Sequence, residues 1–114
     1  MLTENAVADP QTEAFGKAFA ARDSYGLLRT IVSMEKWKRD DAIRQWQSWT
    51  ALLQAALVCQ AGQKAPSPLA REISTARSSR ELMEAITLLR KVISYAQGNI
   101  SVATICGHLI WALH

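Results

Sequence analysis

No Asp, Glu, Lys or Arg follows Lys91 in this chain of 114 residues. Within this uncharged stretch, residues 99–113 are apolar or small at almost every position. We expect one helix to end at Gly98 in the left-handed conformation and a second helix to begin with Asn99 as its N-cap. A helix that is hydrophobic on all sides must be covered on all sides. Because a small domain rarely covers both faces of a terminal helix, this segment predicts contact with a partner surface.

A helical wheel divides the terminal helix into two apolar stripes. The stripe predicted to face the core contains Val102, Ile105, Cys106, Leu109 and Leu113. The second stripe is the candidate subunit interface, and it contains Ile100, Ala103, Gly107 and Trp111. The residues at the centre of this stripe, Ala103 and Gly107, have small side chains or none, so another helix could approach closely. Trp111 would anchor the contact at one end. The other interpretation is a central helix that is buried on all sides by its own chain.

Helical spacing accounts for most of the remaining sequence, and no strand-like alternation occurs. Helix starts are expected at Asp9-Pro10, at Asp23 or Ser24, at Asp40-Asp41, at Ser67-Pro68 and at Ser78, where Glu81 completes a capping-box spacing. The third helix should end at Gly62. Predicted buried stripes include Leu27, Leu28, Ile31 and Val32, and later Leu82, Ala85, Ile86, Leu89, Ile93 and Ala96. The fold class is therefore all-α, a compact bundle of five or six helices.

Length and composition restrict the class of protein further. The length predicts one helical domain over residues 9–114, after a disordered N-terminus at residues 1–8. A net charge of +3 is too small to indicate nucleic-acid binding by itself. Cys59 and Cys106 lie in apolar stretches and are interpreted as core thiols. The polar N-terminus does not resemble a signal peptide, and the apolar tail is too short to span a membrane, so we expect a cytoplasmic protein.

The sequence offers no convincing catalytic, cofactor or metal site. Cys106 and His108 are two residues apart, so on a helix their side chains would point away from each other. The acidic pairs Asp40-Asp41 and Glu81/Glu84 are interpreted as helix-dipole partners and as a solvated face, with an acid–base role as the alternative. The glycines are isolated and form no phosphate loop. We therefore expect no enzymatic activity, no cofactor and no metal.

The segment Lys36, Trp37, Lys38 and Arg39 is the candidate nucleic-acid contact. Its cations could bind phosphates while the tryptophan stacks on a base. The alternative is a solvated helix end whose tryptophan packs on the core. Because Asp40 and Asp41 follow directly, the net field of this segment is small.

Three stretches of the chain resemble one known family. They are residues 34–41 with the following helix that contains Trp46, Trp49, Leu52 and Leu53, the start of a helix at residues 78–82, and the ending at residues 96–101 with its apolar final helix. Over about residues 14–113 the chain resembles the C-terminal helical domain, or collar, of the bacterial DNA polymerase III delta-prime subunit and its clamp-loader relatives.

The resemblance implies a non-catalytic role in subunit assembly. In that family, five collar domains pack into a ring that holds the clamp loader together, and the ATPase modules precede the collar in each chain. The implied partners are other clamp-loader subunits, gamma/tau and delta, with DNA reached only through the complex. The implied process is the loading of sliding clamps during DNA replication. The alternative function is a nucleic-acid-binding module that uses residues 36–39.

Overall fold

The computed structural model describes residues 9–64 and 67–113, and all regular structure in this part of the chain is helical. The helices are α1 (Pro10–Ala20), α2 (Ser24–Val32), α3 (Arg39–Gln60), α4 (Pro68–Ala76), α5 (Ser79–Gln97) and α6 (Val102–Leu113). The predicted all-α bundle is thus confirmed. The disorder predicted for residues 1–8 falls outside the described residues.

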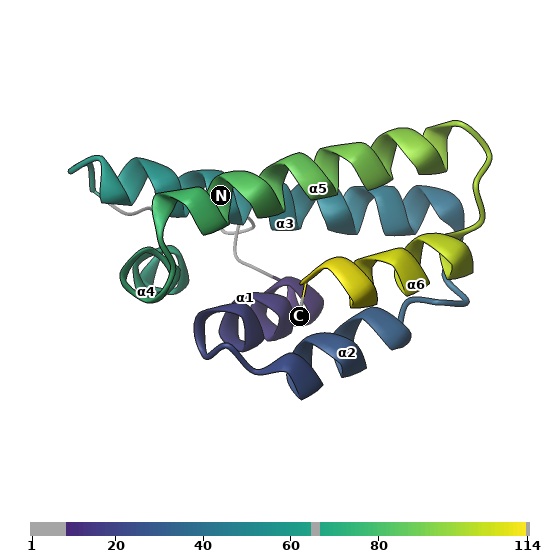
Figure 1. Ribbon diagram of the computed structural model, residues 1–114, viewed down its shortest axis with the longest axis horizontal. Helices are drawn as coiled ribbons and strands as arrows, with labels where there is room; N and C mark the ends of the chain where they lie inside the picture. Colours follow the sequence, from purple (N-terminus) through teal and green to yellow (C-terminus); the bar gives the residue numbers. More distant parts are fainter. Residues whose placement is uncertain (1–8, 65–66, 114) are drawn as a thin grey trace.

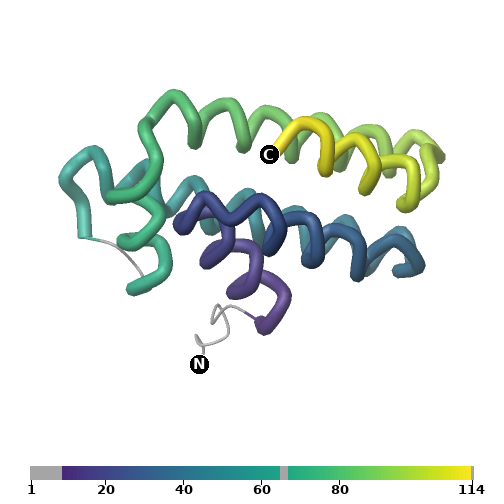
Figure 2. The backbone as a smooth tube through the Cα atoms, turned by 60° about the horizontal axis from the view of Figure 1, so that its bottom comes forward, coloured from purple at the N-terminus to yellow at the C-terminus, as the bar shows by residue number. Residues whose placement is uncertain are grey.

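The two longest helices, α3 and α5, lie side by side in opposite directions (Figure 1). Helix α4 joins them at one end and packs on both α1 and α3. At the other end, the chain turns after α5 so that α6 returns along it (Figure 1). Helix α6 also lies beside α2, as both Figure 1 and Figure 2 show. One side of α6 is therefore packed between α2 and α5.

The core is built around the aromatic side chains of α1 and α3. The Phe15 ring stacks on Trp49, with ring centroids 4.2 Å apart. Trp49 donates its Nε1–H to Oε1 of Gln45 at 2.9 Å, and the hydroxyl of Thr12 donates to the same oxygen at 2.6 Å. These bonds satisfy polar groups that would otherwise be costly to bury. On α5, Ile93 of the predicted stripe is half-buried and packs against the core, and Val92, which the prediction left out, is fully buried.

Most predicted N-caps are confirmed. The side chains of Asp9, Asp23, Ser67 and Ser78 each accept a hydrogen bond from a backbone N–H in the first turn of α1, α2, α4 and α5, respectively. Ser78 and Glu81 form the predicted capping box. Gly62 ends α3 with a φ of +96°, as expected for a left-handed residue that follows a helix.

The turn between α5 and α6 differs from the prediction. Gly98 has a φ of −94°, and Asn99 is the left-handed residue, with a φ of 76°. The N–H of Ile100 donates to the carbonyl of Tyr95 at 3.1 Å, and the N–H of Asn99 donates to that of Ala96 at 3.3 Å. This is the Schellman pattern of a helix C-terminus. The N-cap of α6 is Ser101, whose hydroxyl accepts the N–H of Thr104 at 3.2 Å.

Substitutions at residues 99 and 101 test this assignment. Asn99→Ala should destabilise the chain by about 1 kcal/mol, because alanine resists the left-handed region, whereas Asn99→Gly should preserve stability. Ser101→Ala should cost about 1 kcal/mol as the loss of a cap. Chemical denaturation with far-UV circular dichroism measures each difference. Wild-type stability in Asn99→Ser would contradict the assignment, since serine is a good N-cap but a poor left-handed residue.

Candidate functional site

Helix α6 has one buried face and one exposed face. All five residues of the predicted core stripe are buried, with Cys106 and Leu109 fully so. The residues of the second stripe, Ile100, Ala103, Gly107 and Trp111, are all exposed. The interpretation of α6 as a helix buried on all sides by its own chain is therefore wrong. We call these four residues the outer stripe of α6, although Ile100 lies in the turn just before the helix, so the prediction that placed it in the terminal helix is wrong.

The geometry of the outer stripe suits the close approach of another helix. The indole of Trp111 is 80% exposed at one end of the stripe. At its middle, a Cβ atom added to Gly107 would meet no atom within 4 Å. Helix α6 contains no Asp, Glu, Lys or Arg. Protein–protein interfaces are typically enriched in tryptophan, and their central residues are rarely charged.

Helix α2 adds exposed apolar surface at two positions that its helical spacing predicts to be buried. Leu27 and Ile31 are buried as predicted, but Leu28 and Val32 are 38% and 42% exposed, so the predicted stripe is wrong for these two. The physical reason is the position of α6, which packs beside α2 on one side only. The column formed by Leu28 and Val32 therefore lies at the edge of the packed surface.

Neither Cys106 nor His108 shows the surroundings of a reactive group. Burial, together with the nearby carboxylate of Glu35, raises the pKa of the Cys106 thiol to about 11, so the thiol stays protonated. His108 is exposed, with its ring edge-on to Tyr95 at a centroid distance of 6.3 Å. Among the described residues, no group of three or more His, Cys, Asp or Glu side chains is placed to hold a metal ion.

The basic segment lies at the turn into α3. Lys36, Lys38 and Arg39 are exposed, whereas Trp37 is half-buried and packs against the core. Arg39 donates a hydrogen bond to the side-chain oxygen of Asn99 at 3.3 Å. The packing of Trp37 restricts the stacking face that a nucleic-acid base would need. The nucleic-acid contact stays a prediction.

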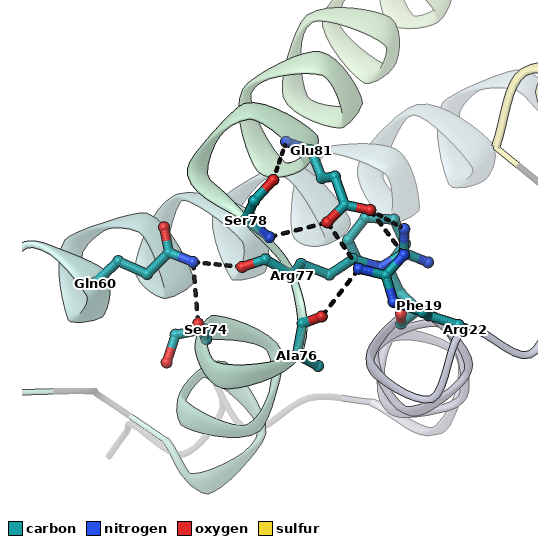
Figure 3. Close-up of polar contacts among 8 residues, drawn as sticks. All are labelled: Phe19, Arg22, Gln60, Ser74, Ala76, Arg77, Ser78 and Glu81. Carbon is teal, nitrogen blue, oxygen red and sulfur yellow. Dashed lines mark hydrogen bonds and ion pairs between the residues drawn. The ribbon is translucent and has the colours of Figure 1, made fainter.

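Sequence reasoning missed a polar cluster that joins the α1–α2 turn to the start of α5 (Figure 3). Glu81 accepts two hydrogen bonds from Arg22, both at 2.8 Å, and one from Arg77 at 2.9 Å. The guanidinium of Arg77 lies 4.0 Å from the centroid of the Phe19 ring, and its Nε–H donates to the carbonyl of Phe19 at 2.9 Å. Glu81 was interpreted as part of a solvated face, but the cluster gives both Arg77 and Glu81 a structural role.

The hydrogen bonds from Arg22, together with that from the Ser78 backbone, lower the pKa of Glu81 from 4.5 to about 2. Arg22 has a φ of 56°, an unfavourable conformation for a residue with a side chain, and from this position its guanidinium donates both hydrogen bonds to Glu81. A carboxylate with so low a pKa remains ionised at neutral pH, which argues against an acid–base role for Glu81.

We expect Glu81→Gln to lower the thermal midpoint at pH 7, because the variant loses the charged acceptor for Arg22 and Arg77. The folded-state pKa of Glu81 is depressed, so its stabilisation is complete above about pH 4.5 and is lost as the pH falls toward 2. The difference in midpoint between wild type and variant should therefore shrink over this range. Thermal unfolding at both ends of the range measures it. Glu84→Gln is the matched control, since the weaker Glu84–Arg80 pair is highly exposed; an equal effect of both variants would contradict the prediction.

Comparisons of the chain with protein-family models, with curated proteins and with solved structures give no match. In the part of the chain that the structure describes, no helix is both long and apolar enough to cross a membrane.

Proposed function

We propose that this chain is a non-catalytic assembly domain of a DNA polymerase III clamp loader, and that it supports sliding-clamp loading in DNA replication. The observation that carries the proposal is the outer stripe of α6, which is exposed, uncharged and open at Gly107. The three stretches that resemble clamp-loader collars supply the identity of the complex. The proposed location is the cytoplasm.

The proposed partners are the gamma/tau and delta subunits, which would pack against the outer stripe through their own collars. Trp111 would fill a recess on the partner, and the partner's helix would approach the backbone at Gly107. The parent complex would use ATP, while this domain would contribute contact surface alone. DNA would be reached only through the assembled complex.

Size-exclusion chromatography with the full-length gamma/tau subunit of the same organism tests the proposal. The chain should co-elute with gamma/tau, and the outer-stripe variant Gly107→Gln should not. Gln54→Ala, on the exposed side of α3, is a surface control that should co-elute like the wild type. Separate elution of the wild-type chain and gamma/tau at concentrations that support clamp-loader assembly would overturn the proposal.

The alternative, a nucleic-acid-binding module, has its own signature. It requires the chain alone to shift the mobility of DNA, with an affinity that falls steeply as salt is raised. Combined replacement of Lys36 and Lys38 by Ala should then abolish the shift. Unchanged DNA mobility at low salt would remove this alternative.

A further inference from the structure

We draw no further inference here: the strongest candidate, the apolar groove between α2 and α6 that Tyr25, Leu28 and Ile110 line, carries none, because nothing in the part of the chain that the structure describes shows what covers it.

Discussion

Leu109→Ala is expected to destabilise the folded chain by about 2–5 kcal/mol, the range for truncating a fully buried leucine. Leu109 is fully buried on the inner face of α6, in the one core cluster that joins this helix to the rest of the domain. The substitution removes apolar surface from the core and leaves a cavity that rigid helices cannot close. Urea denaturation, followed by far-UV circular dichroism and by tryptophan fluorescence, measures the loss in the free energy of unfolding.

Met83→Ala is the matched control for this prediction. Met83 is a side chain of similar size on α5, but more than half of it is exposed, at 55%. Its truncation should change the free energy of unfolding by no more than about 0.5 kcal/mol. A similar small cost for Leu109→Ala would mean that α6 is not docked on the core and would refute the assignment of its inner face.

Helix starts were predictable because their physical cause is local. Asp9, Asp23 and Ser78 each bond a backbone N–H only three residues ahead, so the residue type and its spacing are visible in the sequence. The residue at which a helix ends was harder to predict from the sequence. Either residue of the pair Gly98-Asn99 can adopt the left-handed conformation, and the choice depends on how many residues α5 and α6 need between them.

Periodicity predicted the apolar faces of the helices but not their edges. Leu27, Leu28, Ile31 and Val32 form one stripe on α2, yet only Leu27 and Ile31 are covered. Which column of a wide stripe is covered depends on where α6 lies, and that position is a tertiary property. The exposed half of the α2–α6 surface could therefore not be predicted from α2 alone.

The cluster around Glu81 shows a second limit of the sequence. The capping box places Glu81 near the Ser78 backbone, and this was predictable from spacing. Its partner Arg22 is 59 residues away, so only the packed fold brings the two together. By contrast, the two faces of α6 were predictable, because one helical wheel contains all the information needed to separate Leu109 from Trp111.

Trp111→Ala is expected to weaken binding to the proposed clamp-loader partner by about 30-fold or more, the loss of roughly 2 kcal/mol that truncation of an interface hot-spot tryptophan causes. The same substitution should change the free energy of unfolding of the isolated chain by less than about 1 kcal/mol, because the side chain is 80% exposed. Titration of the gamma/tau subunit measures the first quantity, and urea denaturation measures the second.

Gly107→Gln separates assembly from folding most sharply, because its two expected effects have opposite signs. Glycine inside a helix is unfavourable by about 1 kcal/mol relative to alanine, and glutamine is a good helix former, so the isolated chain should gain stability. The space around Gly107 is open, because a Cβ atom placed there meets no side chain and no other helix within 4 Å. At an interface, however, the same side chain would hold the partner's helix away. A variant that is more stable and still binds as tightly as the wild type would show that the partner does not approach α6 at Gly107.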